Sequence, residues 1–175
     1  MSVNKVSIGR LRYTIKKKKN NEVFLILQEY GVDAYVKDLG SALSIACMTQ
    51  NWEIAKYCLE KGADVNSLDI EGGTALIDTC KFGNVEIVKL LIEAGAEINI
   101  QNKYDKSAIA KAIAHHPQNY ELIQLLIDNG ADPFLQESYR RDDPRITTYN
   151  AYEYALSEIK DEQLMKILDK AKDKR

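Results

Sequence analysis

The side chains that could perform catalytic or metal chemistry are few in this 175-residue sequence, and their spacing is poor for it. A catalytic site needs a nucleophile, a base or metal ligands that converge in one pocket. The only two histidines, His115 and His116, are neighbours in a predicted turn, so they cannot converge on one ion from a single helix face. We therefore interpret them as surface residues. We expect no metal and no cofactor, and we predict that the chain is not an enzyme.

The cysteines and glycines lead to the same expectation. Cys47, Cys58 and Cys80 are odd in number and have no C-x-x-C spacing, so they predict neither a zinc site nor a disulfide framework. Each cysteine lies in an apolar helical pattern, where a free thiol behaves as a small hydrophobic side chain. The pair Gly72-Gly73 lacks the rest of a phosphate-binding loop, and we interpret it as part of a turn.

Charge is distributed unevenly along the chain. Residues 1–20 contain seven lysines and arginines and no acid, although the whole sequence has 24 bases, 26 acids and a formal net charge of −2. The acidic remainder does not favour nucleic-acid binding, which needs a basic face. We interpret the run Lys16 to Lys19 as the polar turn of a terminal unit. The alternatives are an import signal or a patch for an anionic surface.

Composition indicates a folded protein without a membrane segment. Apolar residues make up 45% of the chain and charged residues 29%, which is enough to bury a core and remain in solution. No run of about 18 apolar residues predicts a membrane span. The first residues lack the apolar core of a signal peptide. We expect a cytoplasmic protein that does not bind a membrane and is a monomer.

The strongest pattern is an internal repeat of 33 residues. The motif Gly-Ala-Asp-Val-Asn at 62–66 returns as Gly-Ala-Glu-Ile-Asn at 95–99 and as Gly-Ala-Asp-Pro at 130–133. A second series runs in step with the first and comprises Ser41-Ala42-Leu43, Thr74-Ala75-Leu76 and Ser107-Ala108-Ile109. Two series that share one period indicate a stack of supersecondary units.

Each unit is predicted to be a helix–turn–helix. The Ser or Thr that opens the second series is a helix N-cap, whose side-chain oxygen accepts a bond from a free backbone N–H. Small residues follow, so this first helix can approach its neighbours closely. A longer amphipathic helix comes next, with the i, i+3, i+4 spacing of one wide apolar face, as in Val85 to Ile92. The glycine of each Gly-Ala-Asp segment ends that helix.

The segment from Gly73 to Asn99 closely resembles the ankyrin repeat. Ala75 and Ile77 stand where that family usually has Pro and His. The resemblance implies an all-α solenoid of about five helix-turn-helix units with short β-hairpin-like turns. The predicted units form a single domain and are an N-terminal cap at 1–37, full repeats at 38–70, 71–103 and 104–141, and a C-terminal cap at 142–175.

The resemblance also implies where a partner binds. In ankyrin stacks, partners usually lie against the loop tips and the short inner helices, which together form a concave face. Carried onto this sequence, that face comprises Ile70, Glu71, Asp78, Lys81, Phe82, Lys103, Tyr104, Lys106 and Lys111. Phe82 is interpreted either as an anchor for the partner or as ordinary packing at the turn between helices.

The last loop departs from the repeat. The spacing from Gly130 to Asn150 is 20 residues, against 12 between the corresponding positions of the two preceding units. The extra residues include Tyr139, Arg140 and Arg141, and these residue types are enriched at interface hot spots. The loop is therefore predicted to be a second part of the binding surface, with a flexible solvated loop as the alternative.

The function predicted from these features is non-enzymatic binding of another protein. The small size and the acidic body favour a bacterial immunity or antitoxin-type protein, which would cover the active surface of a toxin. A secreted effector that engages host proteins is the first alternative. An enzyme or a nucleic-acid binder is the second.

Overall fold

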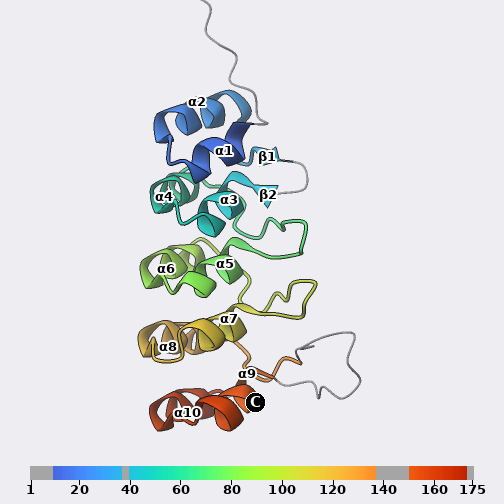
Figure 1. The fold of residues 1–175 in the computed structure, drawn as a ribbon, viewed down its shortest axis with the longest axis vertical. Helices are drawn as coiled ribbons and strands as arrows, with labels where there is room; N and C mark the ends of the chain where they lie inside the picture. Colours follow the sequence, from blue (N-terminus) through green and yellow to red (C-terminus); the bar gives the residue numbers. More distant parts are fainter. Residues whose placement is uncertain (1–9, 37–39, 137–149, 173–175) are drawn as a thin grey trace, which may run out of the picture.

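The chain folds into a column of helix pairs (Figure 1). The computed structural model describes residues 10–36, 40–136 and 150–172. Five shorter inner helices alternate with five outer helices in the described part of the chain. The inner helices are α1 (Leu11–Lys16), α3 (Ala42–Met48), α5 (Ala75–Phe82), α7 (Ala108–His115) and α9 (Ala151–Tyr154). The outer helices are α2 (Asn20–Tyr30), α4 (Trp52–Glu60), α6 (Val85–Glu93), α8 (Tyr120–Asp128) and α10 (Glu162–Asp169).

The predicted N-caps of the inner helices are confirmed. Ser41, Thr74 and Ser107 each accept a hydrogen bond from the backbone N–H three residues later, at 3.3, 3.4 and 3.3 Å. The outer helices α4, α6, α8 and α10 are capped by side chains as well, although the repeat pattern alone did not assign those caps. The residues that cap α4, α6 and α8 are Asn51, Asn84 and Asn119. In the three units that contain α3 to α8, both helices therefore begin at a side chain that the repeat specifies, whereas α1 and α2 have no side-chain cap.

The outer helices end where the sequence predicts. Gly62, Gly95 and Gly130 follow α4, α6 and α8 with φ of 77°, 90° and 89°. Backbone of this kind strains most other residues, so glycine allows the chain to leave the helix sharply. This reversal directs the following loop away from the helices.

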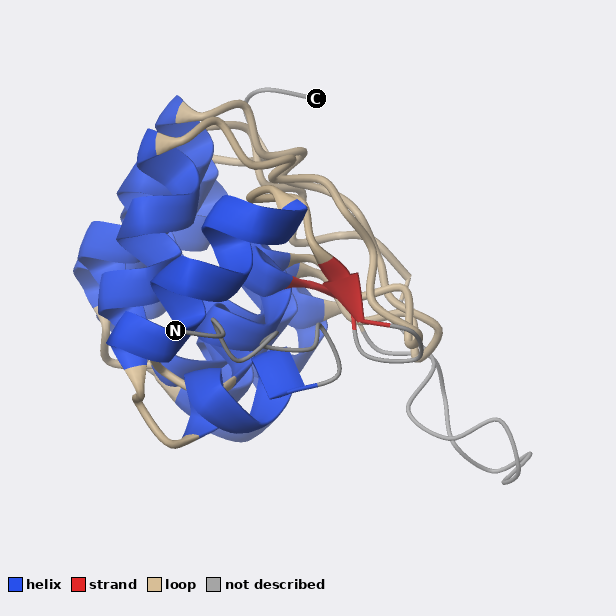
Figure 2. Cartoon of the chain, turned by 90° about the horizontal axis from the view of Figure 1, so that it is seen from above, coloured by secondary structure: helices blue, strands red, loops and turns tan. Residues whose placement is uncertain are grey.

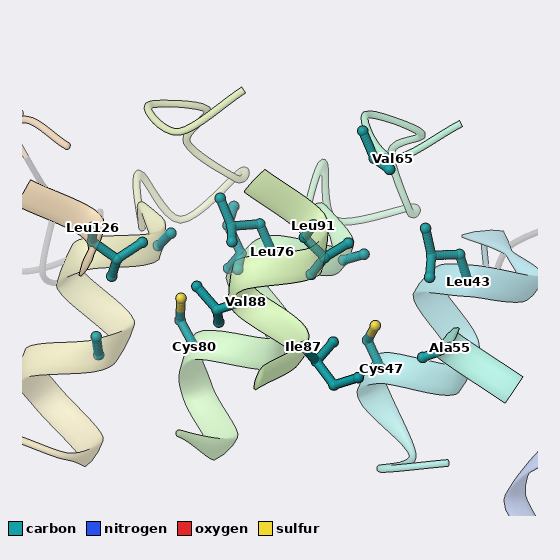
Figure 3. Close-up of a cluster of buried hydrophobic side chains, with 14 of the residues drawn as sticks. Leu43, Cys47, Ala55, Val65, Leu76, Cys80, Ile87, Val88, Leu91 and Leu126 are labelled. Atoms are coloured by element: carbon teal, nitrogen blue, oxygen red, sulfur yellow. The ribbon is translucent and has the colours of Figure 1, made fainter. Parts of the chain in front are cut away.

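The core runs continuously through the stack, and every repeat contributes to it. Figure 3 shows Leu43, Leu76, Leu91 and Leu126 within one buried cluster that spans several units. The three cysteines are buried and free, which confirms their interpretation as small hydrophobic side chains. Burial raises the pKa of the Cys47 and Cys58 thiols to about 12, so neither is a reactive thiolate at neutral pH.

The loops between units are turns fixed by side chains. Within the described residues, the only paired strands are β1 (Tyr35–Val36) and β2 (Gly40–Ser41), which are antiparallel. Later loops are linked through the asparagine of the Gly-Ala-Asp-Val-Asn motif. The Asn66 amide donates to the Gly95 carbonyl at 3.1 Å, and its oxygen accepts from the Glu97 N–H at 2.8 Å. Asn99 makes the equivalent bonds to Gly130 and Asp132. One repeated residue thus fastens consecutive units together.

The turn between α7 and α8 binds the preceding repeat. The His116 ring Nε2 lies 3.0 Å from the Lys81 carbonyl, and the Asn119 amide donates to the Gly83 carbonyl at 3.1 Å. Gly83 has a φ of 73°, and a Cβ there would lie 2.9 Å from the His116 ring. His116 is thus a half-buried link between repeats and less of a surface residue than the sequence predicts.

The last unit is less regular than the others. After four α-helical residues, the chain continues as a π-helical turn, Ala155–Ile159, that ends at Lys160 with a φ of 55°. Ala155 is buried, whereas Leu156 is 55% exposed. The apolar face of α10 closes the unit through Leu164, Ile167 and Leu168, as the sequence predicts. No helix within the described residues is long and apolar enough to cross a membrane.

Candidate partner-binding surface

The described residues among those predicted to bind a partner lie on the inner helices and loop tips, on the side of the stack that carries the loops. Figure 2 shows the loops projecting from one side of the helices in a common direction. We define the inner surface as the exposed and half-buried side chains of α5 and α7 together with the loop tips 68–73 and 102–106. The Asp78 carboxyl on α5 interacts electrostatically with Asp69 and Glu71 on one tip and with Lys111 on α7. These elements therefore form one continuous surface.

The two loop tips are bonded to each other. The Lys103 N–H donates to the Glu71 carbonyl at 2.7 Å, and the Lys103 ammonium donates to the Ile70 carbonyl. The Tyr104 hydroxyl lies 3.4 Å from a carboxylate oxygen of Glu71. Ile70 and Tyr104 remain 47% and 56% exposed. The tips therefore present apolar side chains on a backbone that is already held in place.

Two residues outside the predicted set shape these tips. The Asp69 carboxylate accepts from the backbone N–H groups of Glu71 and Gly73 at 2.8 and 2.7 Å. The side-chain oxygen of Asn102 accepts from those of Tyr104 and Lys106 at 3.0 and 3.1 Å. Bonds of this type stabilise a tight turn without strands. The sequence predicts that Asp69 shapes its turn, and these bonds confirm it. Asn102 was not predicted, and its spacing of 33 residues from Asp69 is the signal in the sequence that could have identified it.

Phe82 packs at the end of α5. Its ring is half-buried and lies edge-on to Trp52, with 6.4 Å between the ring centroids. The Lys81 ammonium lies 5.7 Å from the centroid of the Phe82 ring. These contacts agree with the packing interpretation of Phe82, and they leave Lys81 as the more exposed residue of the pair.

Asp78 is the one acid among the inner helices α3, α5 and α7. Burial and, to a smaller extent, the neighbouring Asp69 raise the pKa of the Asp78 carboxyl to about 7, although Lys81 and Lys111 oppose the shift. Its negative charge is thus only partly present at neutral pH.

The pH dependence of stability tests this feature. The folded chain keeps the Asp78 proton up to about pH 7, because its pKa is raised from 3.8 to about 7, whereas the unfolded carboxyl ionises near 3.8. The resulting cost to folding is absent below about pH 4, grows as the pH rises and is constant above about pH 7. A pKa shift of about three units corresponds to a loss of at most about 4 kcal/mol in the free energy of unfolding, and the partial exposure of Asp78 makes the loss smaller.

We expect Asp78→Asn to raise the free energy of unfolding by about 1–3 kcal/mol at about pH 8 and to leave it unchanged near pH 4. Urea unfolding of both proteins at the two pH values measures the difference. An equal effect at both pH values would mean that the Asp78 carboxyl has an ordinary pKa.

Three predicted residues, Tyr139, Arg140 and Arg141, lie outside the described residues, so their place on the inner surface remains a prediction. The remaining predicted residues all belong to the inner helices or the two tips. Within the described ranges, no group of three or more His, Cys, Asp or Glu side chains could hold a metal ion.

The sequence analysis missed two residues, His115 and Tyr154, that lie beside the predicted residues of α7. His115 and Tyr154 line a cavity together with the predicted residues Lys106 and Lys111. His115 follows Lys111 by four residues, and residues at this spacing share one face of a helix. That spacing could have placed His115 beside Lys111, whereas nothing in the sequence pattern indicates Tyr154.

Capped helix pairs that stack through a continuous core define a helical repeat protein. A family model of ankyrin repeats (3 copies) matches residues 11–102, which is more than half of the chain. A second model, ankyrin repeats (many copies), matches residues 78–127. The chain belongs to the ankyrin-repeat family. No individual curated protein matches the sequence significantly. Ankyrin repeats are generally protein–protein interaction modules and are typically not enzymes.

Proposed function

We propose that this chain binds a partner protein through the inner surface and performs no catalysis. The observation that carries the proposal is the pair of bonded loop tips, which expose Ile70 and Tyr104 on a fixed backbone. A preformed surface loses little conformational entropy when it binds. Most of the favourable free energy of burying such side chains can therefore contribute to affinity. Aromatic residues are also enriched among interface hot spots.

For the biological role, we propose a cytoplasmic, monomeric immunity or antitoxin-type protein that covers the active surface of a toxin. The acidic composition of the chain after residue 20 supports this role. A secreted effector that engages host proteins is the alternative. The two roles differ in a simple test, because co-expression with a toxic partner should restore growth only for an antitoxin. Continued growth arrest in the presence of a bound partner would contradict the antitoxin role.

The binding surface is tested with two matched double variants. Ile70→Ala/Tyr104→Ala removes the exposed apolar side chains of the tips. Leu25→Ala/Tyr30→Ala removes two side chains of α2 that are 56% and 44% exposed. We expect the tip variant to bind the partner captured from the native cell about 10- to 100-fold more weakly, since hot-spot truncations cost about 1–3 kcal/mol.

The α2 variant should bind within about twofold of the unchanged protein, because exposed residues outside an interface contribute little. Circular dichroism establishes that both variants remain folded, and calorimetry measures the affinity. Equal affinities for the two variants would place the binding surface elsewhere, with the basic N-terminal unit as the next region to test.

A further inference from the structure

The first unit of the stack is basic, whereas the rest of the described chain is acidic. Residues 10–36 contain six lysines and arginines against three acids, and residues 40–136 and 150–172 together contain 11 against 18. Figure 1 shows α1 and α2 at one end of the column, so the charge is separated along its length. The six bases, which we call the basic end, are Arg10, Arg12, Lys16, Lys17, Lys18 and Lys19.

The turn between α1 and α2 holds most of these bases on an ordered backbone. The Lys17 and Lys19 N–H groups each donate to a carbonyl of α1 at 2.9 Å. The run from Lys16 to Lys19 is therefore the polar turn of a terminal unit that the sequence predicts. All four lysines of the run are exposed, so their charges face outward from the end of the stack.

The acids of the first unit offset little of this charge. Glu22 pairs with both Arg10 and Lys19, at 3.4 and 3.1 Å. The Asp33 carboxylate accepts from the backbone N–H of the next unit at residue 64, and Glu29 lies in the last turn of α2, away from the lysines. The other four bases form no ion pair within residues 10–36, 40–136 and 150–172. Gathered charges of one sign attract an anionic counterpart.

Exposed apolar side chains accompany the basic end. Tyr13 on α1 and Leu25 on α2 are 53% and 56% exposed. The Lys19 ammonium lies 5.9 Å from the centroid of the Tyr13 ring and also pairs with Glu22. Glu22 precedes Leu25 by three residues, a spacing that puts two side chains on one face of a helix. Tyr13, the basic end and Leu25 therefore belong to one surface.

This combination of charge and apolar area restricts what can bind there. Nucleic acids are held through their phosphates, which exposed leucine does not contact favourably. A second copy of the same surface would place six bases against six. An anionic bilayer offers negative headgroups above an apolar interior, and lysine, arginine and tyrosine all lie favourably at its interface.

The acids of later units do not prevent the approach of such a bilayer. Charges in water are screened over about 8 Å at physiological salt. Packed helices lie about 8–10 Å apart, and α6 is reached from α2 only through α4. The acids of α6, α8 and α10 are therefore too distant to repel a membrane that touches α1 and α2.

We propose that the first unit docks the chain on an anionic lipid surface, with the basic end at the headgroups and Tyr13 and Leu25 entering the interface. Contact of this kind needs no membrane-spanning helix. Such docking departs from the expectation of no membrane binding and agrees with the alternative of a patch for an anionic surface. It goes beyond the proposed function and does not depend on it, because the inner surface lies on α5, α7 and their tips.

Co-sedimentation of the full chain with lipid vesicles measures the docking. We expect vesicles of equal parts phosphatidylserine and phosphatidylcholine to bind the chain at least about tenfold more tightly than pure phosphatidylcholine. The preference should fall as salt is added, since salt screens the attraction. Equal affinity for the two kinds of vesicle, or no binding to either, would overturn the proposal.

Two double charge reversals separate the basic end from overall charge. Lys16→Glu/Lys17→Glu changes the basic end, whereas Lys89→Glu/Lys166→Glu makes the same change in net charge at exposed lysines of α6 and α10. We expect the first to weaken binding to the anionic vesicles at least about tenfold, because each base near such a surface contributes about fivefold. The second should change it less than about twofold. Thermal unfolding controls for stability, and equal weakening by both would overturn the proposal.

Two matched leucines test the apolar contact. Leu25 and Leu156 are 56% and 55% exposed and belong to the first and last units. We expect Leu25→Ala to weaken binding to the anionic vesicles about three- to tenfold and Leu156→Ala to leave it unchanged, since only buried apolar area strengthens binding at an interface. Equal effects of the two truncations would overturn the proposal. Tighter binding of single-stranded DNA than of the vesicles, insensitive to Leu25→Ala, would overturn it in favour of a nucleic acid.

Discussion

Truncation of Leu76 to alanine should lower the free energy of unfolding by about 3 kcal/mol, within the range of about 2–5 kcal/mol for buried leucines. Leu76 is 1% exposed and lies in α5, which packs against α3, α6 and α7. The truncation therefore leaves a cavity where neighbouring units meet. Urea unfolding followed by circular dichroism measures the effect. Because units of a solenoid contact only their neighbours, a loss at a central unit weakens interfaces on both sides.

The control is Leu25→Ala, the same chemical change at a side chain that is 56% exposed. Leu25 lies on α2 at the end of the stack, and we expect its truncation to change the free energy of unfolding by less than about 0.5 kcal/mol. A loss at Leu76 no larger than the loss at Leu25 would contradict the continuous core.

Replacement of Asn51 by alanine should lower the free energy of unfolding by about 2–3 kcal/mol, because it removes both a helix cap and hydrogen bonds to the preceding unit. The Asn51 side chain caps α4, and its amide donates to the Ile15 carbonyl at 3.0 Å and to the Asn20 side chain at 2.8 Å. Asn51 itself is 2% exposed. Without its amide, the buried carbonyl of Ile15 loses a donor that water cannot easily replace.

Asn84→Ala is the matched control, since Asn84 caps α6 through the Ile87 N–H at 3.0 Å. Among the described residues, the Asn84 amide donates no hydrogen bond to the preceding unit, whereas the Asn51 amide does. We expect a cost of about 1 kcal/mol, the usual contribution of an N-cap. The difference between the two variants, measured by thermal unfolding, gives the contribution of the link between units. Equal costs would show that capping accounts for the whole effect.

Much of the fold follows from the sequence because its signals are local. The N-caps Ser41, Thr74 and Ser107 and the helix-ending glycines act within a few residues of their own positions, and each recurs in step with the repeat. The apolar spacing of the outer helices specifies a buried face without reference to a particular partner. The family follows from the same recurrence, so these features could be predicted together.

The irregular last unit was less accessible to prediction. The π-helical turn at Ala155–Ile159 leaves Leu156 exposed while Ala155 is buried. The spacing of apolar residues predicts one buried face only where the backbone stays α-helical. A π-helical turn rotates the side chains that follow it relative to that face. The rotation of this segment therefore depends on packing against α10 and could not be obtained from spacing alone.

The sequence by itself determined the repeat, the helix pairs, their caps and the set of loop-tip and inner-helix residues predicted to bind a partner. Only the tertiary structure decided which of those residues meet. The bonds between the two tips, the link from His116 to the Lys81 carbonyl and the cavity beside Lys111 all join residues that stacking brings together. The raised pKa of Asp78 likewise depends on how deeply neighbouring units bury it. Burial and charge proximity are properties of the assembled stack, and no local signal in the chain encodes them.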